Sequence, residues 1–288
     1  MRVLNTGVAD LAGIAWLTKQ ALAPHIRVDL CFKKRYWLNY PTGRPWQDRE
    51  RLARAADLYH VNVSGHALAR LPRKPVVLHH HGTAYRNNHQ QLNDLAAALG
   101  ARTIVSTVDL LDYAPADAVW YGAPYDLDWL ATHRIPQHGD RIRIAHAPTN
   151  RAAKHTDTFL RACEGLPVDV VLIERTPWRD ALKIKGTCDV LFDQLAYGYG
   201  SNAVEAWGMG IPVISGAAPH IIERMTSMWG ATPFYPATES TLRDAVEAML
   251  DPATRQHWAT VGRAHVSAHH SQAAARATLG RVYRELLQ

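Results

Sequence analysis

Glycines and charged side chains that follow short apolar runs are the residues best suited to chemistry in this sequence. Gly198 and Gly200 form a turn between the apolar run 190–192 and the start of a helical pattern. Glycine allows backbone amides to approach a ligand closely, and a helix N-terminus favours a phosphate group. Tight packing explains two glycines equally well, so this pair alone leaves both explanations open.

Polar residues beside these glycines suit the recognition of a nucleotide. The backbone amides of Gly200, Ser201 and Asn202 could donate hydrogen bonds to a phosphate, and Tyr199 lies between the two glycines. Glu205 follows about one helical turn later, where its carboxylate could accept hydrogen bonds from the hydroxyls of a ribose.

A run of three histidines follows an apolar run over 76–79. His79 and His81 would lie on the same face of a strand, as two metal ligands would. A zinc site needs three or four ligands, and no carboxylate or Cys nearby in the sequence completes one. We therefore predict no metal site.

The segment 33–46 has an unusual composition. It interleaves four aromatic residues with four cations, among turn-forming Pro and Gly residues. This pattern favours a loop that holds an anionic chain and stacks on its bases or sugars. A solvated basic loop is the alternative. The candidate contacts are Lys33, Lys34, Arg35, Trp37 and Trp46.

The net charge is concentrated around that segment. The 288 residues carry 32 Lys and Arg against 26 Asp and Glu, a formal net charge of +6. Residues 27–74 alone hold 11 of the basic and 4 of the acidic residues, so the rest of the chain is close to neutral. Such an excess favours an anionic partner, for example a nucleic acid, a membrane surface or a phosphorylated ligand.

Cysteine use and hydropathy bear on the compartment. Cys31, Cys163 and Cys188 are widely spaced, which argues against a disulfide scaffold or a structural zinc site and favours buried thiols. The first residues lack the apolar stretch of a secretory signal, and no apolar run is long enough to span a membrane. We expect a cytoplasmic protein.

Short apolar runs alternate with amphipathic stretches along the chain, which is typical of βα units around a parallel sheet. In the first half we expect strands over 2–5, 26–31, 58–63, 76–79, 103–106 and 118–121, and helices over 11–22, 49–56 and 92–99. In the second half we expect strands over 142–146, 169–173, 190–193 and 212–215, and helices over 156–163, 178–183, 203–209, 241–250, 252–261 and 272–287.

The alternation restarts after a polar segment over 132–140, which predicts two domains. We expect an α/β fold with one doubly wound domain over 1–131, a second over 141–270, and a C-terminal helix over 271–288 that packs back on the first. Ligands of such sheets bind beyond the carboxyl ends of the strands. Residues that follow strands are therefore the candidates for a site.

The stretch 189–215 resembles the C-terminal half of GT-B glycosyltransferases, specifically the large retaining family that uses nucleotide sugars (glycosyl transferases group 1). The family signature is a Gly-rich loop, then Glu-Ala-Met-Ala, then Gly-x-Pro-Val. Here it reads Gly198-Tyr-Gly200, Glu205-Ala-Trp-Gly and Gly210-Ile-Pro-Val213. The similarity covers most of 100–216 well and the first hundred residues loosely. It implies two Rossmann-like domains that face a cleft.

A second match begins at His146, in the segment 146–157. It resembles the place where the family sets a basic pair on the diphosphate of the donor. Arg151 and Lys154 are the candidates, with Asn150 beside them. Arg suits phosphate through two parallel hydrogen bonds, and Lys supplies a compact charge.

The first half carries weaker matches. The resemblance implies that His81, or next His80, faces the transferred sugar, and that the loop after Gly7 leads to the acceptor and the donor phosphates. Asp10 in that loop is either an acceptor-side carboxylate or the N-cap of the following helix.

One departure concerns the sugar contact. The family often carries two Glu residues separated by seven positions. Glu205 fits the second, but Tyr197 occupies the first. Either Tyr197 and Asp193 take over near the sugar, or the donor is held differently.

The resemblance implies a transferase that moves a sugar, expected to be a hexose, from a uridine-linked nucleotide sugar to a hydroxyl, with retention of configuration and no required metal. The acceptor stays open between a hydroxymethylated base in DNA, a cell-surface glycan and a lipid-linked sugar. A nucleotide-sugar epimerase of the same architecture and a non-catalytic nucleotide-binding module are the alternatives. The oligomeric state is left open.

Overall fold

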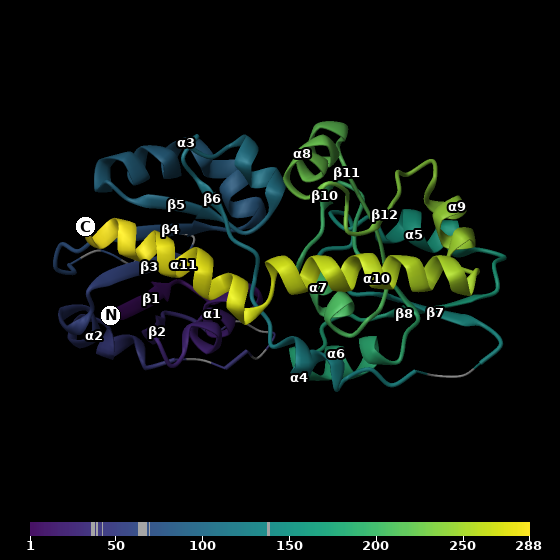
Figure 1. Ribbon diagram of the computed structural model, residues 1–288, viewed down its shortest axis with the longest axis horizontal. Helices are drawn as coiled ribbons and strands as arrows, with labels where there is room; N and C mark the ends of the chain where they lie inside the picture. The colour runs from purple at the N-terminus through teal and green to yellow at the C-terminus, as the bar shows by residue number, and fades with distance from the viewer. Residues whose placement is uncertain (36–37, 39, 42, 63–67, 69, 137–138) are drawn as a thin grey trace. The chain divides into compact units, whose positions relative to one another are not determined.

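The computed structural model describes all residues except 36–37, 39, 42, 63–67, 69 and 137–138 (Figure 1). The chain forms two compact units: Met1–Pro124 with His269–Gln288, and Tyr125–Ala268. The first unit ends earlier than the expected boundary at 131. Residues 125–131 belong to the second unit because the hydroxyl of Tyr125 donates to Glu205 (3.1 Å) there.

The first unit is built on a six-stranded parallel sheet with the strand order β2-β1-β3-β4-β5-β6. The strands are β1 (Arg2–Gly7), β2 (Arg27–Phe32), β3 (Leu58–Asn62), β4 (Val76–His80), β5 (Arg102–Val105) and β6 (Val119–Trp120). The order reverses between β1 and β3, and ligands of doubly wound sheets bind beyond the carboxyl ends at such a point.

Helices surround this sheet, and the last one comes from the C-terminus. They are η1 (Leu11–Gly13), α1 (Ile14–Leu22), η2 (Trp46–Asp48), α2 (Arg49–Ala55), α3 (Gly82–Leu99), η4 (Val108–Asp112) and α11 (Gln272–Leu287), where η marks a 3-10 helix. α11, yellow in Figure 1, packs beside α1. Arg276 of α11 donates to the carbonyl of Ala21 (2.8 Å), and the hydroxyl of Tyr283 hydrogen-bonds to His60 Nδ1 (2.6 Å).

The second unit has its own sheet, in the order β10-β11-β9-β7-β8, with β12 also paired to β11. The strands are β7 (Ile142–His146), β8 (Val168–Leu172), β9 (Val190–Phe192), β10 (Tyr197–Gly198), β11 (Val213–Ala217) and β12 (Tyr235–Pro236). All pairs are parallel except β10 with β11. Here the order reverses between β7 and β9.

Among the described residues, this unit contains seven helices. They are α4 (Leu127–Ala131), α5 (Thr156–Cys163), α6 (Trp178–Gly186), α7 (Ser201–Gly208), α8 (Pro219–Trp229), α9 (Leu242–Ala248) and α10 (Pro252–His269). Central parallel strands are buried on both faces and therefore consist of apolar runs. Ile144, Phe192 and Ile214 come from three of the strands and pack with Phe159 of α5 in the core.

The strands expected from the apolar runs are present to within about two residues, which is the usual uncertainty of element ends. The expected end at residue 63 lies outside the described residues.

The helices differ more from the expected ranges than the strands do. α1 begins only at Ile14, because Ala12 and Gly13 have positive φ angles of 53° and 67°. α3 begins at Gly82 instead of 92, since its first part is polar and lacks apolar periodicity.

The helix expected over 252–261 continues to His269, and α4 and α8 were not expected.

All three cysteines are buried free thiols, as predicted. Among the described helices, none combines the length and the apolar character that crossing a bilayer requires.

Gly186 at the end of α6 provides a test of the packing in the second unit. A Cβ there would overlap the carbonyl oxygen of His133, whereas a Cβ on Gly280 of α11 would meet only the mobile end of Arg284, at 3.2 Å. We expect Gly186→Ala to lower the free energy of unfolding by about 1–3 kcal/mol. Gly280→Ala should be neutral or stabilising by up to about 1 kcal/mol. Urea unfolding of both variants measures this, and equal effects would contradict it.

Candidate functional site

The second unit brings three predicted residues together where its strand order reverses. The turn over 147–155 follows β7, and Asp193 follows β9. The Asp193 side chain is fully buried and accepts hydrogen bonds from Lys154 Nζ (2.6 Å) and from the amide of Gly200 (2.6 Å). One carboxylate thus joins the turn after β7 to the start of α7.

This contact sets a positive charge at a helix N-terminus. Lys154 retains 19% exposure of its side chain, and a Cβ on Gly200 would lie 3.7 Å from its ammonium. The amides of Ser201 and Asn202 occupy the first turn of α7, where a helix offers them no acceptor of its own. An ammonium together with such amides is suited to bind a phosphate oxygen.

Arg151 has a different partner from Lys154. Its guanidinium makes two hydrogen bonds of 2.8 Å to the carboxylate of Glu174, which holds the pKa of Glu174 below its usual range. Both side chains are partly exposed. The carboxylate of Glu174 therefore occupies the pair of guanidinium N–H groups that a phosphate would bind. Asn150 accepts a hydrogen bond from the amide of Ala153 (3.1 Å) and so stabilises the turn.

Tyr199 does not present a side chain to a ligand. Its ring is buried against Trp207, Trp229 and His265, and its hydroxyl hydrogen-bonds to His265 Nε2 (2.8 Å). Because the ring belongs to the core, a contact of Tyr199 with the donor would have to come from its backbone.

Tyr197 and Gly198 form β10, and Gly198 has a φ angle of 84°. This positive φ is the conformation that glycine adopts without strain. The carbonyl of Gly198 accepts a hydrogen bond from the hydroxyl of Ser215. Gly198 therefore shapes the turn that leads to Gly200 and α7, and Tyr197 lies half-buried in the strand beside it.

Glu205 is buried as well, with 1% of the residue exposed. It forms an ion pair with Lys185 and accepts hydrogen bonds from the indole of Trp178 (2.8 Å) and the hydroxyl of Tyr125 (3.1 Å). With its two oxygens occupied in this way, the predicted role of holding a ribose does not fit. Glu205 instead fixes α7 to α6.

Lys185 was not predicted, although the sequence contains a signal for it. Residues 178, 181, 182 and 185 lie on one face of α6, so a Lys shares a stripe with Trp178, Ala181 and Leu182. A buried ammonium requires partners. Lys185 also donates to Asn202 Oδ1 (2.6 Å), and Asn202 Nδ2 donates to the carbonyl of Ala147 (2.9 Å). Asn202 therefore holds the turn after β7 against α7.

In the first unit, Gly7 ends β1 beside β3. A Cβ on Gly7 would lie 2.7 Å from the carbonyl oxygen of Asn62, so the close approach of these strands requires glycine.

Asp10 accepts hydrogen bonds from the amides of Ala15 (2.8 Å) and Trp16 (2.9 Å) in the first turn of α1. It therefore caps the helix, one of the two roles considered for it. Burial raises its pKa to about 6.

A row of neutral polar side chains crosses the carboxyl ends of four strands. Asn62 Nδ2 donates to Asn5 Oδ1 (2.6 Å), Asn62 Oδ1 lies 2.9 Å from His81 Nε2, and His81 Nδ1 lies 2.6 Å from Ser106 Oγ. Because Asn62 Oδ1 can only accept, Nε2 of a neutral His81 carries the hydrogen. The hydroxyl of Ser106 also lies 2.9 Å from the carbonyl oxygen of His80, to which it donates. Both nitrogens of His81 are thus engaged, and burial lowers its pKa to about 3.

The other histidines of the run are also buried and neutral. His80 stacks on Tyr85 with ring centroids 4.1 Å apart, and its two nitrogens have no hydrogen-bond partner among the described residues. This position under a ring does not fit contact with a sugar. His79 Nδ1 lies 3.1 Å from His60 Nε2. Within the described part of the chain, no three His, Cys, Asp or Glu side chains are grouped to hold a metal ion.

The basic segment 33–46 divides into exposed cations and covered aromatics. Lys33, Lys34 and Arg35 are exposed. Trp46 packs against the core of the first unit, with the guanidinium of Arg49 at 4.5 Å from its ring, so its expected stacking on a ligand does not fit. Trp37 lies outside the described residues.

No protein-family model and no curated protein sequence matches this chain. Solved structures do match it. HepE from Anabaena in complex with UDP and glucose is 12% identical over 99% of each chain, with a TM-score of 0.69. A glycosyltransferase from Rickettsia africae is 10% identical over 100% of this chain and 98% of its own, with a TM-score of 0.68. Sucrose-phosphate synthase from Thermosynechococcus elongatus is 13% identical over 99% of each chain, with a TM-score of 0.69.

The chain has the GT-B fold. This confirms the fold class expected from the sequence, since each of the two parallel sheets has the order of a doubly wound domain. The strand order reverses at the ends of β1 and β3 in the first unit and at the ends of β7 and β9 in the second. Asn62 and Asp193 stand at these two points.

The buried pair of Lys185 and Glu205 can be tested by removing one partner. Lys185→Met leaves a buried carboxylate uncompensated and should lower the free energy of unfolding by about 3–5 kcal/mol. Adding Glu205→Gln should recover much of that loss, because no charge then remains unpaired. Chemical unfolding of the single and double variants measures the effect. A Lys185→Met protein as stable as the unsubstituted protein would contradict the structural role assigned to Glu205.

The buried imidazoles predict a loss of stability in acid. Burial lowers the pKa of His60 and His81 to about 3, of His80, His146 and His270 to about 4, and of His79 well below 6.5. Below pH 6.5 these histidines are protonated in the unfolded chain but stay neutral in the folded chain. Each ring then lowers stability by about 1.4 kcal/mol per pH unit, until the pH reaches its folded pKa. Asp10 acts in the opposite direction, because its raised pKa lets the folded chain bind a proton at a higher pH than the unfolded chain. It is one group against six imidazoles.

Urea unfolding between pH 7.5 and pH 5 measures this slope. The midpoint should fall steeply with pH, and a midpoint that stays constant or rises would contradict the neutral buried rings. His80→Phe is the matched variant, because phenylalanine keeps the stacking on Tyr85 without a titrating nitrogen. It should leave stability at pH 7.5 within about 1 kcal/mol. The dependence of unfolding free energy on pH should become shallower by about 1.4 kcal/mol per pH unit, which is the contribution of one titrating ring.

Proposed function

We propose that this protein is a glycosyltransferase that moves a sugar from a UDP-linked donor to a hydroxyl group. The observation that carries the proposal is Lys154, which Asp193 holds at the N-terminus of α7 where the strand order reverses. The GT-B fold supports it, because HepE, which shares this fold, has been crystallised with UDP-glucose.

The second unit would stabilise the leaving diphosphate. When the bond between the anomeric carbon and the diphosphate oxygen breaks, negative charge grows on that oxygen. Lys154 and the amides of Ser201 and Asn202 would meet this charge, and groups that act on charge developing in the transition state lower the barrier. Arg151 would join them by exchanging the carboxylate of Glu174 for a phosphate. Side chains and backbone amides would neutralise the diphosphate, and no metal is required for this role.

The first unit would receive the acceptor. Gly7, Asn62 and His81 lie at or beside the carboxyl ends of its strands, and their neutral polar groups suit hydroxyls. The resemblance of residues 189–215 to the retaining family is the basis for proposing that a hexose is transferred with retention. The concentration of basic residues in 27–74 supports an anionic acceptor, such as a hydroxymethylated base in DNA, over a neutral cell-surface glycan.

A thermal-shift series with nucleotide sugars tests the donor site. A ligand that binds only the folded protein stabilises it by about 2.7 kcal/mol at a hundred times its Kd, so UDP-sugars should raise the Tm by several degrees. Lys154→Met combined with Asp193→Asn should abolish this rise without leaving a buried charge unpaired. Lys183→Ala, an exposed lysine of the same unit paired to Asp180, should keep it. A rise that survives the double substitution would rule out this site.

The same samples distinguish transfer from epimerisation. A transferase should leave the sugar of a UDP-sugar unchanged when no acceptor is present, apart from slow hydrolysis. Interconversion of the sugar in the absence of acceptor, followed by NMR, would instead identify an epimerase of this architecture and contradict the proposal.

A further inference from the structure

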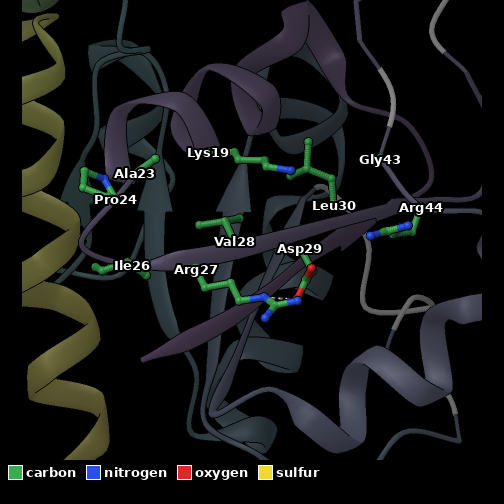
Figure 2. Close-up of a pocket in the computed structure, with 10 residues that line it drawn as sticks. All are labelled: Lys19, Ala23, Pro24, Ile26, Arg27, Val28, Asp29, Leu30, Gly43 and Arg44. Carbon is green, nitrogen blue, oxygen red and sulfur yellow. Dashed lines mark ion pairs between the residues drawn. The ribbon is translucent and has the colours of Figure 1, made fainter.

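A cavity of about 640 Å³ lies along the outer edge of the first unit's sheet (Figure 2). β2 is the last strand in the order, and among the described residues its outer edge is paired by the isolated bridge between Cys31 and Arg44. The chain at residues 43–44 forms one wall. Gly43 fits there because a Cβ would overlap the carbonyl oxygen of Leu30, and that oxygen accepts a hydrogen bond from the amide of Arg44 (2.7 Å).

The cavity is lined by an excess of positive charge. Lys19 reaches it from α1, Arg27 from β2 and Arg44 from the following loop (Figure 2). Asp29 is the single carboxylate among the described residues that line it. Arg2 already holds Asp29 at 2.6 Å, while Arg27 lies 3.7 Å from it and keeps 65% of its side chain exposed. The charges of Lys19, Arg27 and Arg44 therefore remain largely available to an anion.

A second cavity of about 350 Å³ adjoins the first. The two share Ile26, and the second is also lined by Arg276 and Arg284 of α11. One guanidinium nitrogen of Arg276 donates to the carbonyl of Ala21. We call the two cavities together the β2-edge track. Its cations come from α1, β2, the loop at 44 and α11, so they are spread along the edge. A single phosphate would require groups that converge on one point, whereas a spread row suits a chain with repeated charges.

The track differs from the site at the carboxyl ends of the strands. Arg27 pairs with Arg2 in the sheet register, so the track begins at the amino ends of β1 and β2. β2 is six residues long and spans roughly 20 Å. At its far end follow the exposed Lys33, Lys34 and Arg35. A chain bound along β2 would therefore run toward the carboxyl ends, where the acceptor is proposed to react.

We propose that the β2-edge track binds the phosphodiester backbone of a nucleic acid and so anchors it outside the catalytic site. The described aromatic side chains nearby, Tyr40 and Trp46, pack into the protein, so the contacts are ionic and independent of base sequence. That the bound chain also carries the accepting hydroxyl rests on the proposed function, whereas binding itself does not. The concave shape of the track and its buried apolar floor of Val28 and Leu30 favour a chain over a membrane surface.

Fluorescence anisotropy with a short labelled DNA duplex, at salt concentrations between about 50 and 200 mM, tests the track. The logarithm of the affinity should fall linearly with the logarithm of the salt concentration. The combined substitution Lys19→Ala, Arg27→Ala and Arg44→Ala should weaken binding about tenfold or more at the lower salt. It should also make the slope shallower by about 0.9 for each phosphate contact that is lost.

A control variant removes the same charge elsewhere in the basic segment. Arg51, Arg54 and Arg73 line neither cavity, and Arg51, with 63% of its side chain exposed, closely matches Arg27. Substituting these three by Ala lowers the net charge equally. We expect this variant to keep the salt slope and most of the affinity, because its cations do not contact the bound backbone. Thermal unfolding checks that both triple variants are folded.

Three outcomes would overturn the proposal. They are absence of duplex binding at the lowest salt, equal loss in the two triple variants, and binding to vesicles that contain anionic lipid without binding to DNA. The first two remove the track as a specific site, and the third replaces the nucleic acid by a membrane surface. None of them affects the shift of Tm by UDP-sugars, so failure of the track and failure of the proposed function can be told apart.

Discussion

A carboxylate that is buried in the second unit must find its partners inside the fold, and the candidate donor site depends on this requirement. An unpaired buried charge costs several kcal/mol. Asp193 meets the requirement with the ammonium of Lys154 and the amide of Gly200. Because these two residues lie on separate turns, the pairing fixes the turn after β7 against the start of α7. The cation and the helix amides that suit a phosphate are thereby placed side by side.

The two units carry different kinds of polar groups. The second unit places an ammonium and helix amides where its strand order reverses, which suits a diphosphate. The first unit places Asn62 and a neutral His81 at the corresponding point, which suits hydroxyls, while the cations Lys19, Arg27 and Arg44 line the outer edge along β2. This separation supports a division in which one unit holds the leaving group and the other the acceptor. It also separates the proposed ionic anchor along β2 from the proposed place of reaction.

The sequence was sufficient for the strands and for the glycine turn, because apolar runs and positive-φ glycines are local signals. It was not sufficient for the partners of charged residues. Arg151 and Lys154 looked like one basic pair, yet one binds Glu174 and the other Asp193, which are brought near only by the sheet. Glu205 matched a motif, but its burial with Lys185 depends on how α6 packs on α7. The apolar stripe of α6 already contained Lys185, so a lysine within such a stripe was a local signal missed at this site.

Hydrogen–deuterium exchange with and without UDP tests the central claim most directly, because it reports where the nucleotide binds. At saturating UDP we expect slower exchange at the amides of residues 198–202 and in the turn over 147–155. Residues 27–32 of β2 should not change. Saturating UDP that leaves the start of α7 unprotected, or protects the first unit instead, would contradict the assignment of the donor site to Lys154 and the N-terminus of α7.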